Sequence, residues 1–206
     1  MRNHFVDGHE YVDLGLPSGT LWATCNIGAT KPEEYGDYFA WGETSTKNTY
    51  NWSTYKYCNG NQLTKYCNES YRGYNGFTDN LTELQTGDDA ATANWGEGWR
   101  TPTKEQWDEL LTNTTNEWTT QNGVEGRLFT SKKNGKSLFL PAAGYCWDDG
   151  LSRIGRSGYY WSSSLFIDSP YIAWYFYFNS DCYYMYYGYY RYSGHFVRAV
   201  CSTRQN

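Results

Sequence analysis

The clearest helical pattern of apolar positions lies in residues 101–113, TPTKEQWDELLTN. Trp107, Leu110 and Leu111 recur there at the i, i+3 and i+4 spacing that places side chains on one buried helix face. A shorter helix is predicted over 88–96, where a terminal glycine is a stop signal. Two cap signals compete for the start of the longer helix: Thr101 with Pro102, and a capping box of Thr103 with Gln106.

Alternating patterns predict strands in much of the remaining chain, and a turn at Pro17-Ser18-Gly19 divides the first segment into two strands. The predicted strand segments are 11–29, 126–131, 136–142, 158–164, 171–178 and 194–200. Residues 42–80 are polar, rich in Asn, Thr and Tyr, and poor in aliphatic residues, so we expect a loop-rich insertion there.

Residues 171–178, YIAWYFYF, alternate between two sets of side chains. Because one face of such a strand must be core, we expect tyrosines to be displayed from a buried scaffold. The residues expected to be more buried are Trp161, Trp174, Phe176, Phe178 and Met185. The residues expected to be more exposed are Tyr175, Tyr177, Tyr184, Tyr187 and Tyr190.

The overall composition narrows the function classes. The chain has 206 residues, which suits one domain, and 20% of them are aromatic although the mean hydropathy is −0.79. A net charge of −5 argues against nucleic acid as a partner, because no basic stripe is present to neutralise phosphates. No apolar run approaches the ~20 residues of a membrane span, and no basic-then-apolar leader is visible, so we expect neither a membrane span nor a signal peptide in this chain.

The cysteines and histidines give no metal or catalytic pattern. The six cysteines form no CxxC pair and have no zinc-like spacing with histidine. A Cys58–Cys67 disulfide would close a short loop, and free thiols are the alternative. We interpret His195 as structural rather than catalytic. We expect no catalytic residue, cofactor or metal ligand, and a structural calcium ion is left open.

Tyrosine is concentrated near the end of the chain. Seven of the ten residues in 183–192, YYMYYGYYRY, are Tyr, and ten of the chain's 22 Tyr lie in 171–192. A core would use aliphatic residues, because each buried phenol hydroxyl needs a hydrogen-bond partner. Abundant tyrosine instead favours a surface that binds other molecules by contact.

A second compositional feature is the absence of Lys, Glu and Gln from residues 137–203, whereas residues 1–136 contain 8 Lys, 11 Glu and 4 Gln. Strand composition lowers the content of Lys and Glu but hardly to zero. Randomising both adenines of an Asn codon can yield many residue types, including Tyr, Ser, Asp, Cys, Gly, Phe, Ile, His and Arg, but never Lys, Glu, Gln, Met or Trp. Within 166–196, only Trp174 and Met185 fall outside that set. The pattern indicates adenine-directed diversification.

With this pattern and its motifs, the chain resembles the Bacteroidetes "Fibrobacter succinogenes major paralogous domain" family, and within it the variable proteins of diversity-generating retroelements. The matching segments are GHEYVDLGLPSGTLWATCNIGA (8–29), GDYFAWGET (36–44), GWRTPTKEQWDEL (98–110), LFLPAAGY (138–145), GYYWSSS (158–164), AWYFYFNSD (173–181) and GHFVRAV (194–200). They extend over nearly the whole chain.

The resemblance implies an α+β, C-type-lectin fold of the formylglycine-generating-enzyme subclass, loop-rich with short helices and a small antiparallel sheet. It implies a single domain over 1–206, with the insertion at 42–80 and a variable ligand-binding region at 145–198. In that fold the two chain ends pair, so we expect Cys25 and Cys201 to lie close together, near enough for a disulfide.

The leading functional hypothesis is a non-enzymatic binding protein that displays a retroelement-diversified surface. It would recognise a variable protein or glycan ligand, such as a host cell-surface receptor, while displayed on a phage tail or a bacterial surface. The sequence leaves the oligomeric state open. The expected ligand-binding residues are Phe166, Ile167, Asp168, Ser169, Tyr171, Tyr175, Tyr177, Cys182, Tyr183, Tyr184, Tyr186, Tyr187, Tyr189, Tyr190, Tyr192, Ser193 and Phe196.

Two other hypotheses are weaker. A carbohydrate-binding, lectin-like adhesin would use exposed aromatics to stack on sugars, yet the chain lacks the Glu-Pro-Asn or Gln-Pro-Asp triplet of calcium-dependent sugar sites. An enzyme similar to the formylglycine generators would need a reactive cysteine pair, whereas Cys182 stands alone with no base beside it.

Overall fold

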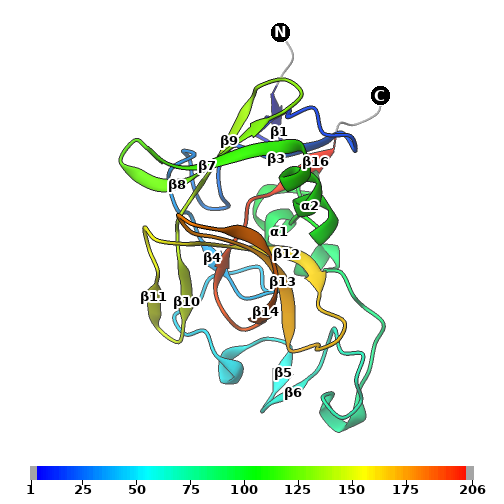
Figure 1. Ribbon diagram of the computed structural model, residues 1–206. Helices are drawn as coiled ribbons and strands as arrows, with labels where there is room; N and C mark the ends of the chain where they lie inside the picture. The colour runs from blue at the N-terminus through cyan, green and yellow to red at the C-terminus, as the bar shows by residue number, and fades with distance from the viewer. Residues whose placement is uncertain (1–3, 203–206) are drawn as a thin grey trace.

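The computed structural model describes residues 4–202 of the protein, apart from the side chain of Tyr187. Strands make up 39% of the structure and helices 13%, and the strands form several sheets with a half-barrel. The strands form three larger sheets and two separate hairpins (Figure 1). The largest sheet has five strands. The expected α+β, C-type-lectin fold is therefore wrong, because the described chain is mainly β.

The β content is higher than expected because a polar segment forms a long hairpin. β7 (Thr114–Gln121) pairs along its whole length with β8 (Val124–Ser131), which pairs in turn with β9 (Ser137–Pro141). Asn122 and Gly123 close the hairpin with φ angles of 50° and 83°, the left-handed conformation that a two-residue hairpin turn requires. The sequence analysis predicted β8 and β9 but missed β7, whose apolar content is low.

The first and last parts of the chain share one sheet, in the order β1-β2-β3-β16. Its strands are β1 (Phe5–Val6), β2 (His9–Val12), β3 (Thr20–Ala23) and β16 (Val200–Ser202). β16 runs antiparallel to β3 and places Val200 opposite Trp22, so the predicted meeting of the chain ends is confirmed (Figure 1). Cys25 and Cys201 are both free thiols, so no disulfide joins them.

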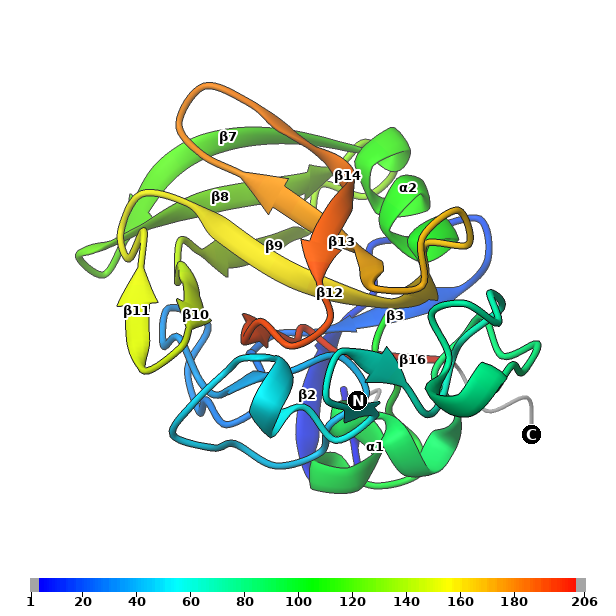
Figure 2. The ribbon, with the colours of Figure 1, turned by 90° about the horizontal axis from the view of Figure 1, so that it is seen from below.

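The five-stranded sheet has the order β14-β13-β12-β15-β4. Figure 2 shows its first three strands, β14, β13 and β12, side by side. Its strands are β4 (Tyr38–Phe39), β12 (Gly158–Leu165), β13 (Ile172–Phe178), β14 (Tyr183–Tyr190) and β15 (His195–Phe196). Alternate residues of β12 enter two different hydrophobic clusters: Tyr159 and Trp161 belong to one, and Tyr160 to the other. The middle of this sheet is therefore buried on both faces.

Two α-helices cover part of the sheets. α1 (Ala90–Trp95) begins after the cap residue Asp89, and Gly96 ends it at a φ of 103°. α2 (Lys104–Asn113) starts at Thr103, whose capping box with Gln106 is formed, so that signal prevails over Thr101. Among residues 4–202, no helix is long and apolar enough to span a membrane.

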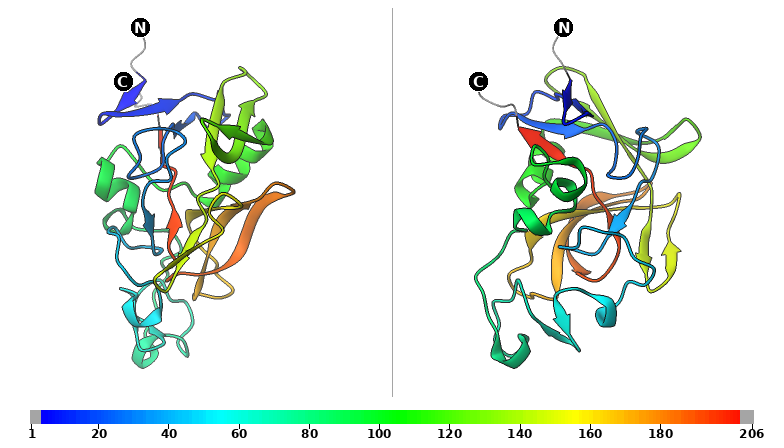
Figure 3. Two further views of the ribbon diagram at one scale, coloured as in Figure 1. Left: turned by 90° about the vertical axis from the view of Figure 1, so that its left-hand side faces the viewer. Right: turned by 180° about the vertical axis from the view of Figure 1, so that it is seen from behind.

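Short elements fill the remaining loops. They are η1 (Trp52–Thr54), β5 (Cys58–Asn59), β6 (Gln62–Leu63), η2 (Tyr74–Gly76), η3 (Thr86–Asp88), β10 (Tyr145–Trp147) and β11 (Gly150–Ser152). The β5-β6 hairpin lies at the end of the molecule opposite the terminal sheet (Figure 3). Cys58 and Cys67 are free thiols, so the short-loop disulfide is not formed either.

Candidate functional site

The tyrosine-rich segment forms β14, an edge strand that pairs only with β13 in its sheet. The register sets Tyr184 opposite Tyr177 and Tyr186 opposite Tyr175, so these four rings share one face. The ring centroids of Tyr177 and Tyr184 are 5.5 Å apart, those of Tyr184 and Tyr186 are 5.4 Å apart, and those of Tyr186 and Tyr175 are 5.7 Å apart. The tyrosines form one continuous contact network rather than isolated side chains.

The exposure of the expected ligand-binding residues varies along the segment. The exposed members are Ile167, Asp168, Tyr183, Tyr184, Tyr186 and Tyr190. The half-buried members are Phe166, Ser169, Tyr171, Tyr177, Cys182 and Tyr189. The buried members are Tyr175, Tyr192, Ser193 and Phe196. The side chain of Tyr187 lies outside the described part of the structure. We call Tyr177, Tyr183, Tyr184, Tyr186, Tyr189 and Tyr190 the tyrosine surface.

The expected alternation of burial on β13 holds at one end of the strand and fails at the other. Phe176 and Phe178 are fully buried, as predicted, and so is Trp161 of β12. Tyr175 is also buried, at 5% exposure, whereas Trp174 is only half-buried, so the predicted order is wrong for this pair. The reason is that β13 is an inner strand with a hydrophobic cluster on each face.

The half-buried Trp174 packs at the side of the sheet rather than in a cluster. Its ring makes an edge contact with Phe166, with centroids 5.5 Å apart, and the Lys104 ammonium of α2 lies 4.9 Å from its centroid. Met185, the expected inward anchor of β14, is half-buried and packs against the cluster that contains Phe176. The scaffold role expected for Met185 is therefore met in part.

His195 lies beneath the tyrosine surface and has no exposed area. Its ring stacks on Trp161 with centroids 3.9 Å apart, and Tyr175 and Tyr189 contact its other sides at 5.1 Å and 4.8 Å. Burial lowers the pKa of His195 well below its ordinary value, so the ring is neutral. These contacts are those of a core aromatic residue, in line with the structural interpretation of the sequence.

The phenols of Tyr175, Tyr184 and Tyr189 stay protonated over the ordinary pH range. Burial is the largest cause that raises the pKa of Tyr175, Tyr189 and Tyr184, and neighbouring tyrosines add to it. Neutral phenols offer both a donor and an acceptor, together with an uncharged ring face. The surface is therefore suited to contact recognition rather than to acid–base chemistry.

Arg191 is a functional anchor that the sequence analysis missed, although it lies inside the tyrosine-rich segment. Its guanidinium is fully buried and donates to the carbonyl oxygens of Pro170 at 2.8 Å, Tyr66 at 3.0 Å and Lys65 at 2.9 Å. It also donates to the Tyr55 hydroxyl at 3.0 Å. Arg191 thereby ties the insertion to the loop before β13 and to the end of β14.

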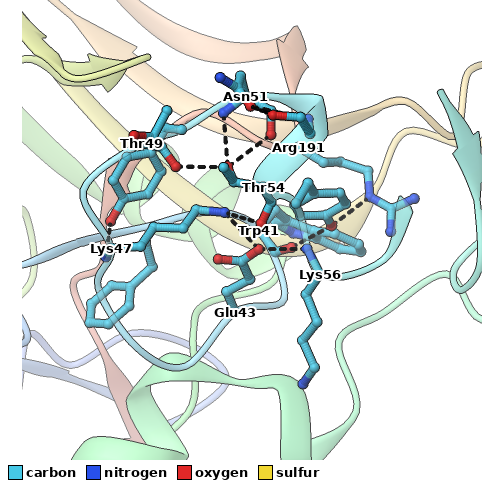
Figure 4. Close-up of polar contacts among 12 residues, drawn as sticks. Trp41, Glu43, Lys47, Thr49, Asn51, Thr54, Lys56 and Arg191 are labelled. Atoms are coloured by element: carbon cyan, nitrogen blue, oxygen red, sulfur yellow. Dashed lines mark hydrogen bonds and ion pairs between the residues drawn. The ribbon is translucent and has the colours of Figure 1, made fainter. Parts of the chain in front are cut away.

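Figure 4 shows how the insertion is held near this arginine. The Glu43 carboxylate accepts from the Lys47 ammonium at 2.9 Å and from the Lys56 backbone N–H at 2.8 Å. Lys47 also donates to the Thr54 carbonyl at 3.0 Å, and Thr54 completes a capping box with Asn51. The loops beside the tyrosine surface therefore have a fixed internal structure.

One cavity lies away from the tyrosine surface. It measures about 510 Å³ and is bordered by Glu83, Asp89, Arg100 and Cys201, among others. Ser163 donates to Glu83 at 2.7 Å, and the Thr101 hydroxyl donates to Asp89 at 2.8 Å. Burial raises the pKa of the Cys201 thiol to about 12, so it offers no thiolate nucleophile. Within residues 4–202, no cluster of three or more His, Cys, Asp or Glu could hold a metal ion.

Comparison with known proteins gives one match. A family model described as a domain of unknown function (DUF8237) matches residues 117–200, which is less than half of the chain. This match covers the hairpin β7-β8 and most of the five-stranded sheet, including the tyrosine surface. Searches of the curated proteins and of the solved structures gave no match.

Proposed function

We propose that the protein is a non-enzymatic binding protein that recognises ligands through the tyrosine surface. The observation that carries this proposal is the continuous network of tyrosine rings on β13 and β14, in which Tyr184 and Tyr186 are exposed at 41% and 37%. Tyr183 and Tyr190 of β14 are also exposed, at 43% and 49%. A tyrosine ring supplies a large contact area with few torsions to freeze, and its hydroxyl adds an adaptable hydrogen bond.

The scaffold beneath the surface supports this proposal. β13 has buried side chains on both faces, and Arg191 and His195 fix the segment from below. A rigid base allows exposed side chains to change without altering the fold, as in other proteins that place recognition on loops and edges. Folding and recognition therefore depend on different residues.

We further propose that the exposed positions are diversified by a retroelement and that the protein is displayed on a phage tail or a bacterial surface. The absence of Lys, Glu and Gln from residues 137–203 supports adenine-directed mutation of Asn codons. Sequencing the neighbouring DNA tests this directly. We expect a reverse-transcriptase gene and a near-copy of the 3′ end with Asn codons at the exposed tyrosine positions; a locus without either contradicts the proposal.

The binding function is tested with a variant in which Tyr184, Tyr186 and Tyr190 are replaced by Ser. Substitutions at exposed positions change stability by about ±0.5 kcal/mol each, so the melting temperature is expected to fall by only a few degrees. Binding to a panel of bacterial surface proteins and glycans is expected to be lost, because a few tyrosine anchors dominate such interfaces.

The control variant replaces the exposed Tyr71 and Tyr74 of the insertion by Ser and is expected to bind like the parent. If the triple variant binds every ligand of the parent equally well, the binding surface lies elsewhere. If it unfolds, the tyrosines are structural and the proposal is wrong. Binding restricted to glycans supports the lectin-like alternative instead.

A further inference from the structure

A small pocket opens at the end of the tyrosine surface, next to Trp147 of β10. Trp147 is 54% exposed and has a fixed backbone on both sides. Before it, Cys146 pairs with Gly194 through hydrogen bonds of 2.8 Å and 2.9 Å, and after it, Asp148 pairs with Tyr50 through bonds of 2.7 Å and 3.0 Å. The two bridges hold the backbone of Trp147 in place beside the end of β14.

The opposite wall of the pocket is a stacked pair of tyrosines. The rings of Tyr190 and Tyr192 lie 5.4 Å apart at an angle of 11°, and Trp52 supports Tyr192 with a centroid distance of 4.9 Å. The pocket measures about 200 Å³, and its lining residues are Trp147, Gly188, Tyr189, Tyr190, Tyr192 and Ser193. Small-molecule sites measure roughly 300–1,000 Å³, so this pocket is suited to one side chain.

The hydroxyl of Ser193 indicates that the pocket takes a polar group. Ser193 is 1% exposed, and its Oγ has no hydrogen-bond partner among the described residues. Buried polar atoms in folded proteins nearly always have a partner, because leaving one unpaired is costly. A ligand that donates a hydrogen bond into the pocket would supply the missing partner.

The charge beside the pocket favours a cation. Asp148 follows Trp147 directly and is exposed, and its Oδ1 accepts from the Asn51 amide at 3.1 Å. Asp148 is close enough to Tyr192 to contribute to the raised pKa of that phenol, after burial and Tyr190. Aromatic faces attract cations through the ring quadrupole, and the carboxylate adds a direct charge interaction.

We propose that this pocket receives a lysine or arginine side chain of a protein ligand, an inference that rests on the proposed binding function. The charged end would lie between the indole of Trp147 and the Tyr190–Tyr192 pair. One N–H would donate to Ser193 Oγ, and the Asp148 carboxylate would face the cation.

The test uses short capped peptides of the form Gly-Lys-Gly and Gly-Arg-Gly, with Gly-norleucine-Gly as the uncharged match and methyl glucoside as the sugar probe. Binding is followed by NMR through the indole N–H of Trp147. We expect the basic peptides to shift this signal and to bind roughly tenfold more tightly than the norleucine peptide, and added salt to weaken their binding.

Three variants locate the site. Trp147→Ala and Asp148→Asn are each expected to weaken binding of the lysine peptide by roughly tenfold, and Ser193→Ala by a few-fold. The matched control, Tyr71→Ala, removes an exposed aromatic ring in the insertion and should leave binding unchanged. Trp147→Ala lacks the indole N–H, so binding to this variant is measured from the line broadening of the peptide signals.

Equal binding of the norleucine peptide, or tighter binding of methyl glucoside, overturns the inference. An unchanged affinity of Asp148→Asn for the lysine peptide also overturns the inference. This variant keeps the side-chain oxygen that accepts from Asn51. The proposed function is tested separately. If the triple tyrosine variant no longer binds a ligand that Trp147→Ala still binds, only the basic-side-chain pocket is refuted. A ligand kept by both variants refutes the inference and the tyrosine surface together.

Discussion

At the scale of single residues, polar and aromatic side chains occupy many of the core positions that aliphatic residues occupy in other proteins. Arg191 is enclosed without a carboxylate partner and instead satisfies three backbone carbonyls and one hydroxyl. His195 lies among aromatic rings and stays neutral. Arg191 specifies one arrangement of the loops, because its hydrogen-bond partners Tyr55, Lys65, Tyr66 and Pro170 come from separate parts of the chain.

Replacing Arg191 by Met is expected to lower the free energy of unfolding by about 3 kcal/mol or more, because several buried acceptors lose their donor at once. Urea unfolding measures this change. The exposed Arg156 gives the matched control, and Arg156→Met should stay within about 0.5 kcal/mol of the parent. Equal stabilities for the two variants would show that Arg191 does not anchor the insertion.

His195 predicts a dependence of stability on pH. Its pKa is lowered in the folded protein, so above about pH 6.5 neither the folded nor the unfolded chain carries the extra proton. Below that pH the unfolded chain binds a proton that the folded chain does not, and the free energy of unfolding falls by about 1.4 kcal/mol per pH unit. Urea unfolding of the parent and of His195→Phe at several pH values should show a steeper fall in the parent, because His9, whose pKa is also lowered, remains in both; parallel profiles contradict the assignment.

At the scale of elements, local sequence signals decide where a helix or hairpin turn begins and ends. Long-range packing decides which face of an element is buried. The capping box of Thr103 and Gln106 sets the start of α2, and Asn122-Gly123 sets the turn of the β7-β8 hairpin. On β13, however, the apolar alternation does not reveal which face meets solvent, because hydrophobic clusters cover both.

The capping box gives a prediction at this scale. Thr103→Ala removes the side chain that accepts from the Gln106 N–H, and it should cost about 1 kcal/mol in the free energy of unfolding. Thr112→Ala, at an exposed position of the same helix, should change stability by less than about 0.5 kcal/mol. Thermal unfolding of both variants checks the difference, and a neutral Thr103→Ala would mean that packing alone sets the helix start.

At the scale of the whole molecule, the chain closes on itself without covalent cross-links. β16 adds to the sheet of β1, β2 and β3, and the insertion is fastened to the five-stranded sheet by Arg191. All six cysteines are free thiols in the structure. Packing and hydrogen bonds therefore hold the distant segments together.

The free thiols predict that a reducing agent leaves the melting temperature unchanged. Alkylation after unfolding without reductant should label all six cysteines, as mass spectrometry can count. Labelling of only four cysteines, together with a lower melting temperature in reductant, would show that a disulfide forms.

The sequence by itself predicted both helices, the strands β3, β8, β9, β12 and β13, and the position of the tyrosine-rich segment, whereas it left the start of α2 open between Thr101 and Thr103. These features depend on periodicity, caps and composition, which act over a few residues. Only the tertiary structure decided that the molecule is mainly β, that Tyr175 is buried while Trp174 is half-buried, and that Arg191 is an anchor. It also brought Trp147, Tyr192 and Ser193 together around one pocket. Those outcomes depend on which distant segments cover each side chain, and no local pattern contains that information.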